Sequence, residues 1–109
     1  MELEARSRTQ DAIAAYSLAI QSDPGFARAY VNCGNAFNRL DQPLKAIQDS
    51  DEAIRLDPQR AIAYSNRSAA LMAIGQLERA IQDSDEAIRL DPKLAIAYIN
   101  RGGAFMGLG

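Results

Sequence analysis

The chain has 109 residues, of which 48% are hydrophobic, and no segment approaches the run of about 18 apolar residues that a membrane-spanning helix needs. Its formal net charge is −2 and its acidic and basic residues are interspersed, which excludes the clustered basic face that nucleic-acid binding requires. The absence of histidine excludes an imidazole-based active site, and the single cysteine, Cys33, excludes an internal disulfide and is expected to serve packing.

The sequence contains internal copies of itself. The stretch from Gln48 to Pro58 recurs letter for letter from Gln82 to Pro92, which sets a period of 34 residues. On this period, residues 27–60 and 61–94 are complete copies, and residues 95–109 are the start of a further one. A fixed period of this length indicates a repeat protein, in which each copy is one structural unit that packs on its neighbours.

Six helices are predicted in chain order. Residues 1–7 either extend the first helix or form a frayed tail, and residues 8–26 hold the second helix of a partial repeat. A pair of helices follows in each of the complete copies, 27–60 and 61–94, and the first helix of another partial repeat occupies 95–109. The chain is therefore expected to begin and end within a repeat, as a fragment of a longer protein would.

Spacing and punctuation support these helices. In the first complete copy, Tyr30, Gly34 and Phe37 recur at helical intervals. Pro58 ends the second helix, because proline lacks an amide donor and pushes the preceding residue out of helical geometry. Pro43 is instead expected in the first turn of a helix, where its missing N–H would have had no partner.

This pattern resembles the tetratricopeptide repeat family. The resemblance rests on Tyr30, Gly34, Phe37, Ala46, Ala53 and Pro58 and their counterparts, and it covers nearly the whole chain. It implies an all-α fold, a right-handed superhelix or solenoid of antiparallel helix pairs with six helices. It also implies that the first helices form a concave wall on which protein ligands bind.

The resemblance places an asparagine row with apolar flanks on that wall. The expected peptide-binding residues are Asn32, Asn35, Asn66, Asn100, Ile62, Met72, Ile96 and Ile99. A side-chain amide both donates and accepts hydrogen bonds, so a row of amides can pair with the backbone of an extended peptide. The alternative is that the asparagines make hydrogen bonds between neighbouring helices, and the two roles are compatible.

One binding site known in the groove of this family, the carboxylate clamp, binds acidic C-terminal tails of heat-shock chaperones through lysine, arginine and asparagine side chains. We call it the chaperone-tail device. The resemblance places the cationic residues of this device at Val31, Ile96 and Asn100, so the groups that would neutralise carboxylates are missing. Only the asparagine positions, Asn35 and Asn66, are retained. A chaperone-tail site of this kind is therefore not expected.

Charged residues recur at matching places in the copies. Arg67 and Arg101 replace the usual aliphatic residue of a first helix, so they should need carboxylate partners. We predict inter-repeat ion pairs of Asp49 with Arg67 and of Asp83 with Arg101; the alternative is that the arginines reach a ligand. The acidic runs lie within helices rather than around a glycine turn, so no metal site is expected.

No enzyme signature is present, because the chain has no phosphate-binding glycine loop, no nucleophile with a base and no metal-ligand cluster. No cofactor is expected. The main hypothesis is a protein–protein interaction scaffold that binds a peptide. One alternative is a self-assembly element, in which Tyr98, Phe105 and Leu108 let incomplete terminal repeats of neighbouring chains complete each other. Another alternative is a stable part of a larger scaffold whose ligand site lies elsewhere. No secretory signal is seen, so a cytoplasmic location is expected.

Overall fold

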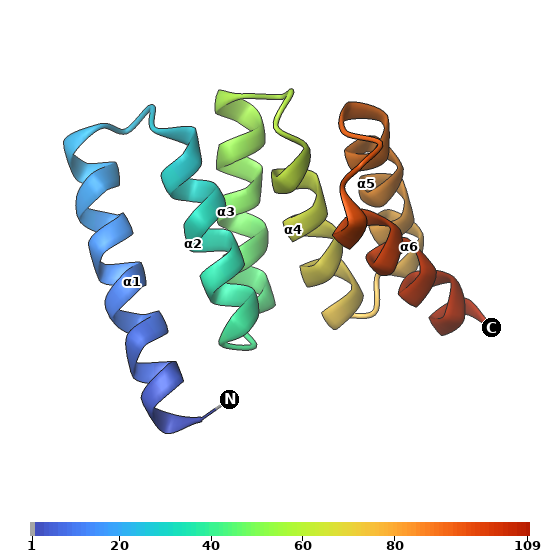
Figure 1. The fold of residues 1–109 in the computed structure, drawn as a ribbon, viewed down its shortest axis with the longest axis horizontal. Helices are drawn as coiled ribbons and strands as arrows, with labels where there is room; N and C mark the ends of the chain where they lie inside the picture. Colours follow the sequence, from blue (N-terminus) through green and yellow to red (C-terminus); the bar gives the residue numbers. More distant parts are fainter. Residues whose placement is uncertain (1) are drawn as a thin grey trace.

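The computed structural model describes residues 2–109, and these form six α-helices with no strand. The helices are α1 (Leu3–Ser22), α2 (Ala27–Arg39), α3 (Pro43–Leu56), α4 (Ala61–Ala73), α5 (Leu77–Leu90) and α6 (Ala95–Leu108). They follow one another along the molecule in chain order, with α1 at one end and α6 at the other (Figure 1). The predicted all-α solenoid of helix pairs is confirmed. No described helix is long and apolar enough to cross a membrane.

Alanine builds most of the core. Six alanines of the complete copies, Ala46, Ala53, Ala63, Ala70, Ala80 and Ala87, have no exposed surface, and neither have Ala97 and Ala104 of α6. Small side chains at helix–helix contacts let the helix axes approach closely, since the interaxial distance depends on the residues at the contact. Leu71 is the largest side chain that is fully buried. The fully buried core therefore consists mainly of small side chains, and larger, partly exposed apolar residues such as Ile54 and Ile81 pack against it.

Helix α1 is longer than its counterparts α3 and α5, with 20 residues against 14 in each. Its extra residues lie at the N-terminal end, where the complete copies have a turn. The segment has neither glycine nor proline at that place, so the helix continues to Leu3. Met1 lies outside the described residues. Helix α1 contains no buried residue, whereas α3 and α5 each bury several.

The turns between the helices of each pair need a left-handed residue. Gly75 has a φ of 79°, and the equivalent residue of the preceding copy, Asp41, has a φ of 56°. Side chains other than glycine reach this region only at a cost, although aspartate tolerates it better than most. Glycine adopts this conformation without strain at residue 75, whereas Asp41 carries strain that Gly75 avoids.

Replacing Asp41 by glycine is therefore expected to stabilise the protein by roughly 0.5 kcal/mol, because relief of the strain exceeds the extra entropy of glycine in the unfolded chain. Gly75→Ala is the matched control and should lose about 1 kcal/mol, although an added Cβ would meet no atom within 4 Å. Urea denaturation of both variants checks the prediction. A lower midpoint for Asp41→Gly would show that the aspartate side chain stabilises the turn.

Candidate functional site: the first-helix face

Helices α2, α4 and α6 are the first helices of their copies, and α4 packs against both of the others. We call their shared surface the first-helix face. Its α2 end is polar, with Asn35 and Arg39 exposed. Its α6 end is apolar, with Ile99 67% exposed and Ile96 and Met106 also exposed. The face therefore changes from polar to apolar along the stack.

Two members of the asparagine row tie the first helices together. The Nδ2 of Asn66 donates a hydrogen bond to the carbonyl oxygen of Val31 at 3.1 Å, and the Nδ2 of Asn100 donates to that of Ser65 at 3.1 Å. Both asparagines are buried. They therefore have the structural role that the sequence left open as an alternative, while contact of the row with a peptide remains a prediction.

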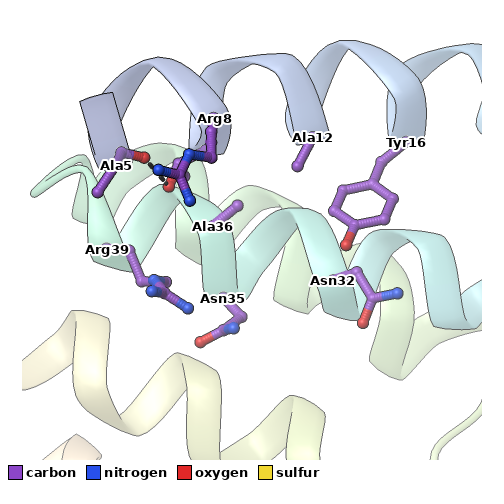
Figure 2. A pocket seen from close by; sticks show the side chains of 9 residues that line it. Ala5, Arg8, Ala12, Tyr16, Asn32, Asn35, Ala36 and Arg39 are labelled. Atoms are coloured by element: carbon purple, nitrogen blue, oxygen red, sulfur yellow. Dashed lines mark hydrogen bonds between the residues drawn. The ribbon is translucent and has the colours of Figure 1, made fainter. Parts of the chain in front are cut away.

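Asn32 is the third member of the row and differs from the others. It is half-buried, and no first helix precedes α2 among the described residues to offer it a carbonyl oxygen. It lines a pocket of about 250 Å³ between α1 and α2, which we call the α1–α2 pocket. Figure 2 shows its walls, which α1 forms with Ala5, Arg8, Thr9, Ala12 and Tyr16 and α2 with Asn32, Asn35, Ala36 and Arg39.

The predicted apolar flanks differ in exposure. Ile62 is half-buried and packs against the core cluster of Val31, Ala53 and Ala63. Met72 lies over Gly103, where an added Cβ would come within 2.8 Å of the methionine methyl carbon. Ile96 and Ile99 are exposed. In the middle of the first-helix face the apolar side chains are only partly exposed, and the more exposed ones lie on α6.

The predicted ion pairs of Asp49 with Arg67 and of Asp83 with Arg101 are wrong. Arg67 instead holds Asp83 of its own copy with two hydrogen bonds, Nε to Oδ2 at 2.8 Å and Nη2 to Oδ1 at 2.9 Å. Its Nη1 reaches Oδ1 of Asp51 in the preceding copy at 2.9 Å. The hydrogen bonds to Asp83 raise the pKa of the Arg67 guanidinium. Burial lowers this pKa, but by less.

Helix geometry explains the correction. Asp83 lies on the side of α5 that faces the first helix of its own pair, next to Ser84, which contacts Ser68 of α4. Asp85, two residues later, lies on the side that faces the following first helix, and its Oδ1 accepts from Nη1 of Arg101 at 3.1 Å. Coupling between copies is thus present, but through Asp51 and Asp85.

The copy that begins at Ala27 has no arginine at the place of Arg67. The residue there is Cys33, which is buried, so Asp49 has a thiol nearby where Asp83 has a guanidinium. Burial raises the pKa of Asp49 to about 6. Burial and, to a lesser extent, the charge of Asp49 raise the pKa of the Cys33 thiol to about 11. A thiol with so high a pKa is a poor nucleophile, in keeping with a packing role.

Asp49→Asn is expected to raise the free energy of unfolding at pH 7 by about 1–2 kcal/mol, after allowance for screening of this half-buried group by solvent. The folded-state pKa of about 6 exceeds the ordinary value of 3.8, so ionisation destabilises the fold. The destabilisation caused by ionised Asp49 is absent below pH 3.8. It grows as the pH rises from 3.8 to about 6, and it is complete above about pH 6. Urea denaturation at pH 4 and pH 7 tests this, and an equal gain at both pH values would contradict it.

The described residues contain no group of three or more side chains that could hold a metal ion. The polar groups that they expose on the first-helix face are amides and guanidiniums, which donate hydrogen bonds but form no nucleophile–base pair. The chemistry that this face offers is non-covalent recognition.

Two family models match the chain. The model described as "Tetratricopeptide repeat" matches residues 27–60, and the model described as "TPR repeat" matches residues 69–109. Together they account for more than half of the sequence. No curated protein sequence matches the chain.

Solved structures of TPR domains are similar to the whole fold. The first TPR of Spaghetti (RPAP3), bound to the HSP90 peptide SRMEEVD, is 27% identical with a TM-score of 0.88 over 95% of this chain and 82% of that one. The second TPR domain of human RPAP3, in complex with the HSP70 peptide SGPTIEEVD, is 25% identical with a TM-score of 0.85 over 91% and 82%. The TPR2B domain of yeast Sti1, in complex with pHsp70, is 26% identical with a TM-score of 0.85 over 94% and 86%.

Proposed function

The chain belongs to the tetratricopeptide repeat family, and from this premise we propose that its first-helix face binds an extended peptide segment of a partner protein. The observation that carries the proposal is the polar-to-apolar change along α2, α4 and α6. An extended peptide that crosses these helices would meet hydrogen-bond donors at one end and apolar side chains at the other. The proposed role is binding without catalysis.

The polar end favours the backbone and acidic groups of the peptide. Asn35 and Arg39 are exposed there, and Arg39 offers five N–H donors. The apolar end favours large apolar side chains, because Ile99 and Met106 stand clear of the fold, and the flexible methionine adapts to different shapes. The preferred ligand is thus a segment with a polar portion followed or preceded by apolar residues.

The similar structures that contain HSP90 or HSP70 peptides support the class of ligand, but this chain has different groups at the cationic positions of the chaperone-tail device. Val31 is buried in the core, Ile96 is apolar, and the amide of Asn100 is committed to Ser65. We therefore propose a partner other than an acidic chaperone tail. The peptide SRMEEVD is expected to bind at least tenfold more weakly than a peptide selected for apolar character.

Selection from a random peptide library, followed by fluorescence-anisotropy titration of the selected peptide, tests the proposal. Ile99→Glu should weaken binding at least tenfold without unfolding the protein, because Ile99 is largely exposed. Leu44→Glu is the matched control, since Leu44 is exposed to a similar extent but lies in the first turn of α3, away from the first-helix face. Equal affinity of both variants for the peptide would refute binding on this face.

A further inference from the structure

Arg67 shows how this fold holds a guanidinium between second helices. The guanidinium makes two hydrogen bonds to Asp83 of α5 and one to Asp51 of α3, and its Cζ lies 5.7 Å from the centroid of the Tyr64 ring. A planar guanidinium matches the two oxygens of a carboxylate and also stacks on an aromatic ring. The cation is therefore held by charge, by shape and by contact with the ring.

The same three places recur one period earlier in the sequence, but without an arginine. The counterparts of the groups that hold Arg67 are, in the same order, Asp49 of α3, Ser17 of α1 and Tyr30 of α2. We call these three residues the α2 cation site. The counterpart of Arg67 itself is Cys33, whose side chain ends at its sulfur atom. Helices α1 and α3 both pack against α2, so the helices that carry the site are assembled, and the described residues supply no guanidinium to it.

Asp49 is the group that this arrangement leaves unpaired. It makes no hydrogen bond or ion pair with any residue from 2 to 109, although it is half-buried. The nearest cation along α3, Lys45, has its ammonium 5.6 Å from the centroid of the Phe37 ring. The pKa of Asp49, raised by burial to about 6, leaves the carboxyl mostly ionised at pH 7. A cation from outside the chain would stabilise this charge, and the part of Asp49 that stays exposed gives it access.

We propose that the α2 cation site binds an arginine side chain of a partner protein. The guanidinium takes the place that the Arg67 guanidinium has in the next copy, with N–H groups directed at both oxygens of Asp49 and its plane over the Tyr30 ring. The Ser17 hydroxyl donates to the carbonyl oxygen of Ile13 at 2.9 Å, so its lone pairs can accept a further hydrogen bond. Arginine is favoured over lysine, because an ammonium is a compact, strongly hydrated charge that lacks the planar fork.

The α2 cation site is separate from the first-helix face. Its carboxylate and its hydroxyl come from the second helices α3 and α1, whereas the peptide is proposed to bind across α2, α4 and α6. Asp49→Asn should therefore leave the affinity for a library-selected peptide unchanged. The two proposals can fail independently, because each has its own ligand and its own variants.

NMR titration of the isotopically labelled protein with N-acetylarginine amide, at pH 7 and constant ionic strength, tests the arginine site. N-acetyllysine amide is the matched probe with the same charge. The arginine probe should cause saturable shifts of the Asp49 carboxyl carbon and of the amides of Cys33 and Tyr30, with an affinity about tenfold higher than that of the lysine probe. Asp49→Asn should abolish these shifts. Glu78→Gln removes an exposed negative charge from α5 instead, and should keep them.

Cys33→Arg gives the sharpest test, because it supplies the missing guanidinium from within the chain. It should lower the pKa of Asp49 and prevent binding of the arginine probe, whereas Cys33→Ser keeps a small side chain and should bind as the unaltered chain does. Circular dichroism checks that each variant is folded, and if Cys33→Arg does not fold, Asp49→Asn decides. The proposal is overturned by the absence of saturable shifts in the unaltered chain, by equal affinity for the two probes, or by binding that survives Asp49→Asn.

Discussion

Leu71→Ala is expected to lower the free energy of unfolding by about 3 kcal/mol. Leu71 is 1% exposed and lies in a cluster with Ala80 and Ala104. The alanines around it have no side-chain freedom with which to move into the space that the deleted atoms leave. The cavity therefore persists, and its cost adds to the lost transfer of the leucine side chain from water.

Leu44→Ala is the matched control for this prediction. It makes the same chemical change at a residue that is 66% exposed, so the expected effect lies within about 0.5 kcal/mol of zero. Urea denaturation at pH 7, with both variants measured beside the unaltered chain, gives the two values. Similar losses for the two leucines would mean that the packing around α4 does not control stability.

Arg67→Met is expected to cost about 3 kcal/mol at pH 7, because it leaves the buried carboxylate of Asp83 without its counter-charge. Methionine keeps much of the apolar length of the arginine, so the loss reports mainly on charge. The double variant Arg67→Met/Asp83→Asn should recover part of the stability, since it removes the unpaired charge as well. Denaturation of the single and double variants measures the recovery.

Arg101→Met provides the comparison at the equivalent place in the next copy. Arg101 holds only Asp85, whose side chain is largely exposed, so the expected loss is about 0–1 kcal/mol. Equal losses for the two arginine variants would contradict the view that burial of Asp83 sets the strength of the Arg67 interaction.

The repeat period and the residues that start or end helices are sufficient to predict the fold. The exact recurrence of residues 48–58 at 82–92 indicates the second helices, and Pro43 and Pro58 mark the start and the end of a helix that the structure contains. The sequence leaves open whether residues 1–7 continue the first helix, because no proline or glycine marks its start. In the structure α1 begins at Leu3.

Spacing was not sufficient to assign the contacts of the charged and amide groups. Asp49 and Asp51 lie two residues apart, and which of them faces the next copy depends on the angle between helices. The asparagine row was visible in the sequence. The hydrogen bonds that Asn66 and Asn100 donate to the preceding first helix require that the helices approach closely. That approach depends on the buried alanines, and the spacing of residues along the sequence does not show it.

Binding on the first-helix face is the central claim, and amide chemical-shift mapping of the isotopically labelled protein with a library-selected peptide tests it most directly. The account predicts the largest shifts at Asn35 on α2, Met72 on α4 and Ile99 on α6, with small shifts along α3 and α5. Shifts concentrated on the outer surfaces of α3 and α5, with α2, α4 and α6 unchanged, would contradict it.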